Sequence, residues 1–293
     1  MSERRIEIKT SRTAQWTCVS RAASSLESNP HYRSDDHIAR LLVPAFLGHF
    51  LRVPLVRRFY RRFMAPKGIY EYTIARTKYI DAVFREALSQ DLDQVLIFGA
   101  GFDTRALRFA AAAGNTRFFE LDVPITQQAK LGQYRRRGLR LPPNATFIAI
   151  DFDKESLPDK LDQADFERNR KSLFVLEGLL MYLQPESVDG TFQVIGRFAG
   201  PGSRVVFDAV HAAVLRQPES YYGGKEIAET VAKAGEKWHF GIQEGELEAF
   251  LSSYGLTAID QKDAPALERT YFAGARCING THFLVTAVKP AGA

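Results

Sequence analysis

The sequence has little cysteine and no long hydrophobic run. Its 293 residues include two cysteines, Cys18 and Cys277, which stand far apart and outside any CxxC spacing. This excludes a disulfide framework and is typical of a reducing compartment. No apolar stretch approaches the roughly 20 residues of a membrane-spanning helix, so we expect no membrane span. The first ten residues, MSERRIEIKT, lack the apolar core of a signal peptide, and we therefore expect a cytoplasmic protein.

Charge of one sign is also not in large excess. The formal net charge is +5 and the isoelectric point is near 9.1, which does not predict binding to nucleic acid. One arginine-rich stretch, VRRFYRRF at 56–63, is open to two interpretations. It is a basic amphipathic helix that lies on a membrane or an acidic partner, or a solvated helix face with its aromatic side chains turned inward. We favour the second. A further arginine run, YRRRGLR, occupies 134–140.

The hydrophobic pattern changes near residue 90. Before it, apolar residues recur at helical intervals in 35–51 and 68–88, which predicts a helical segment. After it, short apolar runs alternate with helix-like segments, and this predicts a parallel sheet covered on both faces. The runs lie at 94–99, 117–121, 146–150, 172–176 and 203–209, with a final strand at 281–290. The helix-like segments lie at 103–113, 124–137, 185–199 and 246–256.

The stretch QVLIFGAGFDTRAL, 94–107, is typical of a strand that turns into a nucleotide-binding helix. Gly99 and Gly101 allow the backbone to approach a ligand closely. A dinucleotide fingerprint has a third glycine where this chain has Thr104, which argues against a dinucleotide. Asp103 is expected to cap the helix that follows.

Acidic residues follow successive predicted strands. Glu120 and Asp122 end the second, Asp151 follows the third and Glu177 follows the fourth. A carboxylate at the end of the second strand can accept both hydrogen bonds of a ribose diol. An edge this acidic would repel a pyrophosphate and suits an adenosine that carries a cationic group. The pattern therefore points to S-adenosylmethionine as the cofactor.

Several stretches together resemble the leucine carboxyl methyltransferase-like family, which includes protein phosphatase methyltransferases and bacterial polyketide O-methyltransferases. The matching pieces are TAQWTCVSRAASS (13–25), IARTKYID (74–81), GAGFDTRALRF (99–109), FFELDVPITQQAK (118–130), DFD (151–153) and EGLLMYL (177–183). The resemblance implies an α/β class I methyltransferase fold, with a Rossmann-like, seven-stranded mixed sheet whose last strand is antiparallel. After residue 184 the resemblance is thin, and substrate selection is expected there.

The resemblance also implies an organisation of the chain. A helical N-terminal segment, 1–90, would cover the site, and the cofactor-binding core would span 91–293. The stretch 211–241 is too long for a simple connection, so we expect it to be an inserted lid or a pair of helices.

Cofactor-binding residues follow from the resemblance, position by position. Arg76 looks like the arginine that grips the methionyl carboxylate; an ion pair with Glu71 or Asp81 on its own helix is the alternative. The remaining matched positions are Gly99 and Gly101 in the loop, Asp122 at the ribose, Asp151 with Phe152 at the adenine edge, and Glu177 at the amino-acid end. Arg21 could reach the cofactor carboxylate or an acidic substrate.

Methyl transfer from a sulfonium is an in-line displacement that depends on alignment and needs no metal. A carboxylate acceptor is already ionised at neutral pH, whereas a hydroxyl benefits from a base. We name His211, which follows the fifth strand, as a candidate base, and Tyr182 as a candidate catalytic or pocket-shaping residue. His239 is a second candidate base, and Tyr221 and Tyr222 are further candidates for shaping or closing the pocket.

The sequence thus predicts an S-adenosylmethionine-dependent methyltransferase that methylates an oxygen, carboxylate or hydroxyl, of a small molecule. The acceptor is expected to be acidic or aromatic, and the oligomeric state stays open. Two alternatives remain: a nicotinamide-dependent oxidoreductase, which rests on the glycine loop alone, and a non-catalytic protein that binds a membrane or nucleic acid through the basic helix.

Overall fold

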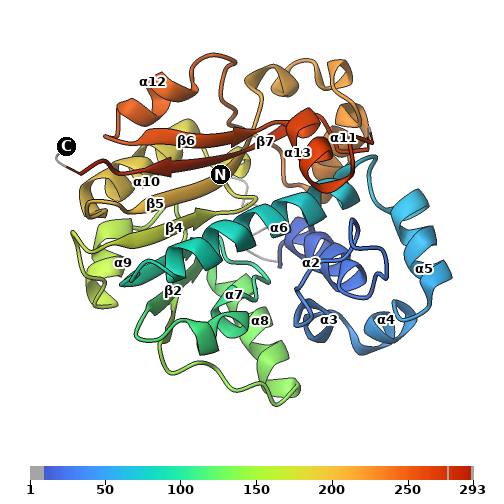
Figure 1. The fold of residues 1–293 in the computed structure, drawn as a ribbon, viewed down its shortest axis with the longest axis horizontal. Coiled ribbons are helices and arrows are strands. Elements are labelled where there is room, and N and C mark those ends of the chain that lie inside the picture. Colours follow the sequence, from blue (N-terminus) through green and yellow to red (C-terminus); the bar gives the residue numbers. More distant parts are fainter. Residues whose placement is uncertain (1–9, 276, 292–293) are drawn as a thin grey trace.

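The computed structural model describes residues 10–275 and 277–291, so most of the stretch considered as a signal peptide lies outside the described residues. A seven-stranded sheet crosses the molecule in the order β3-β2-β1-β4-β5-β7-β6 (Figure 1). Strands β1 to β5 are parallel, and β7 pairs antiparallel with both β5 and β6. The mixed sheet implied by the family resemblance is confirmed. The strands are β1 (Gln94–Phe98), β2 (Arg117–Asp122), β3 (Ala145–Ala149), β4 (Ser172–Leu176), β5 (Arg204–Val210), β6 (Thr257–Lys262) and β7 (His282–Val288).

Helices cover both faces of the sheet, which explains why β1 is apolar at almost every position. Successive side chains of a strand point to opposite faces. Val95 and Ile97 accordingly pack in one cluster with α2 (Arg12–Ser24), α6 (Ile69–Leu88), α8 (Pro124–Arg136) and α13 (Ala264–Tyr271). Leu96 and Phe98 pack in another with α9 (Leu157–Gln163), α10 (Pro185–Phe198) and α12 (Leu247–Ser252). The sheet is therefore the middle of three layers (Figure 1).

Two helical expectations need correction. The periodic run 35–51 forms two helices, α3 (Ala39–Leu42) and α4 (Ala45–Phe50), because Pro44 forces the preceding Val43 into extended backbone. The segment 103–113 forms a single helical turn, α7 (Arg105–Arg108), and a 3-10 turn, η2 (Ala110–Ala112).

One strand, β6, has no counterpart among the apolar runs of the sequence. It lies at the edge of the sheet, where its side chains alternate between exposed and half-buried and are mostly polar. An edge strand has at most one covered face and therefore needs few apolar residues, so it does not stand out in the sequence as an apolar run.

Two helical regions lie outside the layers. At the N-terminal side, α4 is followed by α5 (Pro54–Phe59) and the π-helical turn η1 (Tyr60–Met64), at the periphery of the molecule (Figure 1). The stretch 211–241 contains two 3-10 turns, η4 (Ala212–Leu215) and η5 (Pro218–Ser220), and the helix α11 (Gly224–Ala234). Within the described part of the chain, no helix is both long and apolar enough to cross a bilayer.

Candidate active site

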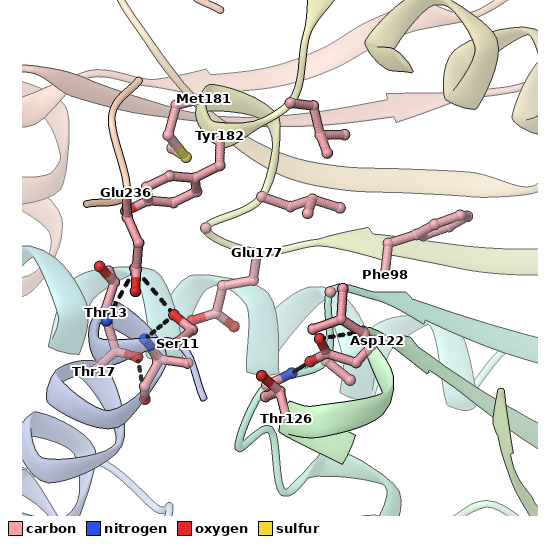
Figure 2. A pocket seen from close by; sticks show the side chains of 18 of the residues that line it. Ser11, Thr13, Thr17, Phe98, Asp122, Thr126, Glu177, Met181, Tyr182 and Glu236 are labelled. Carbon is pink, nitrogen blue, oxygen red and sulfur yellow. Dashed lines mark hydrogen bonds between the residues drawn. The ribbon is translucent and has the colours of Figure 1, made fainter. Parts of the chain in front are cut away.

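A cavity of about 610 Å³ lies at the carboxyl ends of β1 and β4. The strand order reverses here: the chain runs outward from β1 to β3 and then returns to β4 on the other side of β1. Open parallel sheets bind ligands at such a point, and the volume lies in the range of small-molecule sites. Further walls come from the N-terminal part of α2 and from residues 235–239, which follow α11 (Figure 2).

The loop after β1 contacts the acid at the end of β2 through its backbone. Gly101 donates its N–H to one oxygen of Asp122 (Figure 2), and Val123 donates its own to the other at 2.7 Å. Gly99 and Gly101 have φ angles of +57° and +49°, which glycine adopts without strain. A Cβ atom on Gly99 would lie 2.9 Å from the Leu179 side chain. The two glycines thus let the loop pass close to Leu179 and Ala14 and present its backbone N–H to Asp122.

The two carboxylates of β2 have different environments. Asp122 lines the cavity, and burial raises its pKa to about 6 although two backbone N–H groups favour the ionised form. Glu120 is fully buried outside the cavity wall and pairs with Lys130 of α8 at 2.5 Å. Burial raises the pKa of Glu120 to about 7 despite this partner. Asp122 is therefore the carboxylate of this strand that can reach a ligand.

Glu177, which follows β4, is held in the cavity wall by two arginines. Arg105 Nη1 lies 2.6 Å from one carboxylate oxygen, and Arg76 Nε lies 2.9 Å from the other. Burial alone would raise the pKa of Glu177, but the charges of Arg105, Arg76 and Arg21 outweigh it and hold the pKa far below its usual range. Glu177 is consequently ionised at neutral pH.

Arg76 pairs across the sheet and not along its own helix. Its Nη1 lies 2.7 Å from Asp208 of β5, and neither Glu71 nor Asp81 is its partner. Asp208 also accepts hydrogen bonds from the Tyr72 hydroxyl at 2.9 Å and from a backbone N–H of the β4 loop. This network fixes a buried guanidinium at the wall of the cavity, where the sequence predicted one.

Arg21 and Asp103 also reach the cavity wall. Arg21 pairs with Asp36 at 2.6 Å and donates to the Phe102 carbonyl at 2.9 Å, so its position is fixed by the fold. Asp103 accepts the backbone N–H of Arg105, the first residue of α7, at 2.6 Å, although the N-cap position itself is Thr104 and not Asp103. Asp103 therefore orders the start of α7 and contacts the arginine that holds Glu177.

The loop after β3 contributes one wall of the cavity. Asp151 and Phe152 both line it, and the Phe152 ring lies 6.1 Å from the ring of Phe98. Asp151 accepts the backbone N–H of Asp153 at 3.1 Å, which leaves the other carboxylate oxygen 3.5 Å from Lys154 Nζ. A carboxylate and an aromatic face therefore stand together at this end of the site.

Of the two side chains predicted to be catalytic, one lines the cavity and the other does not. Tyr182, in the 3-10 turn η3 (Leu180–Tyr182), lines the cavity, and burial raises its pKa to about 12, so its hydroxyl is protonated at neutral pH. His211 does not line the cavity. Its backbone N–H donates to the Thr281 carbonyl, and its ring packs against Tyr221 at 5.4 Å and Phe283 at 4.9 Å. Packing against Tyr221 and Phe283 holds the ring outside the cavity lining, which corrects the expectation of His211 at the edge of the cleft.

His282, the first residue of β7, does line the cavity, and sequence reasoning missed it. Its ring stacks on Tyr72 at 4.5 Å and meets the edge of Trp238 at 5.2 Å. Burial, together with the charge of Arg76, lowers the pKa of His282 well below its usual value. The ring is therefore neutral at neutral pH. His239 lines the cavity as well, as the sequence proposed.

Glu236 is a second residue that the sequence did not single out. It follows α11 and reaches the N-terminus of α2, where it accepts the backbone N–H of Arg12 at 2.7 Å. It also accepts the backbone N–H of Thr13 at 3.2 Å (Figure 2). The Ser11 hydroxyl donates to it at 3.1 Å. A carboxylate satisfies the free N–H groups at a helix N-terminus. The contact joins the start of α2 to the segment that follows α11, and both line the cavity.

Comparison with known proteins assigns this arrangement to a family. The sequence pattern described as leucine carboxyl methyltransferase matches residues 14–196, which is more than half of the chain. The chain belongs to this family. The match includes every strand end that carries an acid of the cavity, from Asp122 to Glu177.

Relatives agree with the assignment. A Mycolicibacterium smegmatis protein named as an S-adenosyl-L-methionine-dependent methyltransferase is 30% identical over 211 residues, which cover 69% of this chain and 68% of that protein. A Bacillus subtilis protein named in the same way is 27% identical over 68% of this chain and 65% of its own length. Among solved structures, an O-methyltransferase family protein from Burkholderia thailandensis has a TM-score of 0.50 at 12% identity, covering 85% of this chain and 68% of that one; it supports the fold alone.

This protein of the leucine carboxyl methyltransferase family is thus an S-adenosylmethionine-dependent methyltransferase, and the nicotinamide alternative is set aside. The residues present suit the cofactor. The carboxylate of Asp122 lines the cavity. The buried hydroxyl of Thr126, in the wall next to Asp122, has no hydrogen-bond partner within residues 10–275 and 277–291 (Figure 2). A ligand with several hydroxyl groups can hydrogen-bond to both side chains.

Proposed function

We propose that this methyltransferase transfers the methyl group of S-adenosylmethionine to a hydroxyl oxygen of a small, partly aromatic molecule. The observation that supports this is a neutral histidine, His282, in an aromatic wall of the same cavity that presents Asp122 and Glu177. The bound cofactor supplies an electrophilic methyl group on a sulfonium. The protein has to align the acceptor with it and to receive the acceptor's proton.

The donor end of the cavity would hold the cofactor by its three parts. Asp122 would accept the hydrogen bonds of the ribose diol, and Phe152 with Asp151 would hold the adenine ring and its amino group. Glu177 would attract the positively charged amino group, while the buried guanidinium of Arg76 would face the carboxylate. In support, all of these side chains line one cavity, and those of Asp122, Arg76 and Glu177 are already fixed by hydrogen bonds or ion pairs.

The acceptor would bind where the insertion meets the sheet. A separate apolar cluster lies there, built around Met181, Ile227 and Trp238, with Tyr182 packed against it. These residues also line the cavity. Burying an aromatic acceptor against them would be favourable, and the sequence after residue 184, where the family pattern fades, contributes Ile227 and Trp238.

The hydrogen bonds around His282 determine which ring nitrogen is free to act. Asn279 donates its amide group to the Lys67 carbonyl at 3.0 Å and accepts the Thr281 backbone N–H at 3.1 Å, so its side-chain oxygen is an acceptor. The Thr281 hydroxyl must then donate its single proton to that oxygen, at 2.5 Å. Its 2.7 Å contact with His282 Nδ1 therefore requires a proton on Nδ1.

Nε2 of His282 is consequently an unprotonated acceptor. It would hydrogen-bond the hydroxyl of the acceptor and take its proton as the methyl group is transferred. A low pKa keeps this nitrogen free before transfer, and the imidazolium formed during transfer, which lies beside Arg76, would pass its proton to water.

The N-terminal segment and the insertion would together form the cover of the site. Glu236 joins them, and residues from both line the cavity. A closed cover would keep water away from the methyl group.

The test is the chemistry of the product. The enzyme with isotopically labelled S-adenosylmethionine is offered a panel of phenols, alcohols and carboxylic acids, and the labelled product is treated with alkali. Methyl ethers survive this treatment and methyl esters hydrolyse, so an alkali-stable product on a phenol or alcohol is expected. Labelled products on carboxylates, nitrogen or sulfur alone would contradict the proposal. Failure of S-adenosylhomocysteine to bind in a calorimetric titration would contradict the assignment of the cavity itself.

A further inference from the structure

The peripheral helices of the N-terminal side carry exposed apolar side chains. Six of them lie between residues 46 and 64 and are 55–74% exposed: Phe46, Phe50, Leu55, Phe59, Phe63 and Met64. A soluble surface usually scatters such residues singly, and a contiguous group marks an interaction site. We call Leu55, Phe59, Phe63 and Met64, with the exposed arginines between them, the arginine–aromatic face.

The apolar residues of this face form a stripe along α5 and η1. Leu55, Phe59 and Phe63 are spaced four residues apart, which places them on one side of a helix. The rings of Phe59 and Phe63 lie 5.2 Å apart. This overturns the expectation that the aromatic residues of VRRFYRRF turn inward: Tyr60 is buried, while Phe59 and Phe63 point to solvent.

Positive charge accompanies the stripe, and negative charge is missing from its sequence. Between Asp36 and Glu71 the chain has no Asp or Glu. Arg52, Arg58 and Arg62 are exposed, and the Arg62 guanidinium lies 5.3 Å from the centre of the Phe63 ring. Exposed arginines beside exposed phenylalanines form an amphipathic cationic surface, the kind that lies in the headgroup region of an anionic bilayer.

We propose that this face docks the enzyme onto an anionic membrane surface. Aliphatic and aromatic side chains would enter the boundary of the acyl chains, while the arginines would contact lipid phosphates. A second copy of the chain is a poor occupant, because a two-fold contact through this face would oppose arginine to arginine. A nucleic acid is also a poor occupant, because the aliphatic side chains of Leu55 and Met64 can neither hydrogen-bond to it nor neutralise its phosphates. Docking is independent of the proposed hydroxyl acceptor.

Three variants test the docking. The stripe variant, Leu55→Ser with Phe59→Ser and Phe63→Ser, removes apolar area. The charge variant, Arg58→Gln with Arg62→Gln, removes two charges from the same face. The matched control, Arg135→Gln with Arg136→Gln, removes two charges from exposed arginines at the end of α8.

Flotation with vesicles at low salt gives the readout. The protein is expected to float with phosphatidylcholine vesicles that contain phosphatidylglycerol and not with phosphatidylcholine alone. The stripe and charge variants should each lower the partition coefficient at least about tenfold, and the control should leave it unchanged. Unchanged melting temperatures would show that the variants fold. If the stripe variant does not fold, the charge variant compared with the control decides.

Four results would overturn the proposal. They are no flotation of the unmodified protein at low salt, an equal loss in the control, flotation of a folded stripe variant at the original level, or a stable dimer in light scattering that the stripe variant dissociates. The last would make the face a contact between copies. None of these results bears on S-adenosylhomocysteine binding, so docking and methyl transfer are tested separately.

Discussion

Replacing Asp122 with asparagine should weaken cofactor binding and, at the same time, stabilise the protein without ligand. The substitution keeps the size of the side chain and removes its charge. In the structure this carboxylate is buried beside two backbone N–H groups and has no cationic side chain in direct contact within the described residues. Its function would be to accept hydrogen bonds from the ribose diol. Keeping it charged in a buried position lowers the free energy of unfolding.

The magnitude of the stability effect follows from the pKa. Burial raises the pKa of Asp122 from 3.8 to about 6, a shift of about 2 units or about 3 kcal/mol. The folded protein binds this proton more tightly than the unfolded chain does, so stability falls as the pH rises from about 4 to about 6, and the loss persists at neutral pH. Asparagine avoids that loss but gives up one of two backbone hydrogen bonds, about 1 kcal/mol. A net gain of about 1–2 kcal/mol is expected.

The effect on binding has the opposite sign. A carboxylate accepts from both ribose hydroxyls, and each charged hydrogen bond contributes about 1.5–3 kcal/mol. The single side-chain oxygen of asparagine cannot serve both hydroxyls and a backbone N–H. We expect a loss of about 2–3 kcal/mol, which makes the Kd for S-adenosylhomocysteine about 30- to 150-fold higher.

Two measurements at neutral pH check this prediction. Isothermal titration with S-adenosylhomocysteine gives the Kd, and thermal unfolding without ligand gives the stability. Glu120→Gln is the control, because Glu120 lies on the same strand, is also buried and does not line the cavity; its folded form should bind the ligand normally. A variant of Asp122 that binds within about threefold of the unmodified protein, or that melts at a lower temperature, would refute the reasoning.

Three further predictions concern other parts of the site. Glu236→Gln removes the charge that holds the N–H groups of Arg12 and Thr13, so release of S-adenosylhomocysteine in stopped-flow should be about 5- to 10-fold faster, with no change if the contact is incidental. His282→Gln should lower the single-turnover rate on a hydroxyl acceptor at least about 100-fold and leave the cofactor Kd unchanged; an unchanged rate would exclude it as the base. Gly99→Ala, at φ +57°, should lower the free energy of unfolding by at least about 1 kcal/mol in denaturant titration and weaken cofactor binding, and normal values for both would contradict the close fit.

The parts of the site that were predictable from sequence belong to the sheet. A buried parallel strand followed by glycines is visible as a short apolar run, and the chain order then places the ends of β1 to β4 at one edge. This is why Asp122, Asp151 and Glu177 could be placed together before the structure was known. The residues alone did not separate Asp122 from Glu120, and the family resemblance singled out Asp122. The structure supplies the physical reason, because Glu120 pairs with Lys130 outside the cavity while Asp122 lines it.

The parts that were not predictable depend on contacts between distant segments. His282 was read as part of a final strand, since nothing local shows that Tyr72 and Trp238 enclose its ring. His211 looked better placed because it follows a strand directly. The outward rings of Phe59 and Phe63 were missed for a related reason: a pattern shows which side chains share a helix face, and not whether anything covers that face.

The contact between Glu236 and the start of α2 has a consequence for biosynthesis. The two partners are separated by 224 residues along the chain, so the first turn of α2 leaves the ribosome long before the carboxylate that caps it. A nascent chain that stops short of residue 236 would carry an uncapped, frayed helix start and an open cavity, whatever the state of its sheet. Closing the site is therefore a late step of synthesis, and we expect a protease to cut near residue 12 in ribosome-stalled chains lacking residue 236 and to spare that position in the full-length chain.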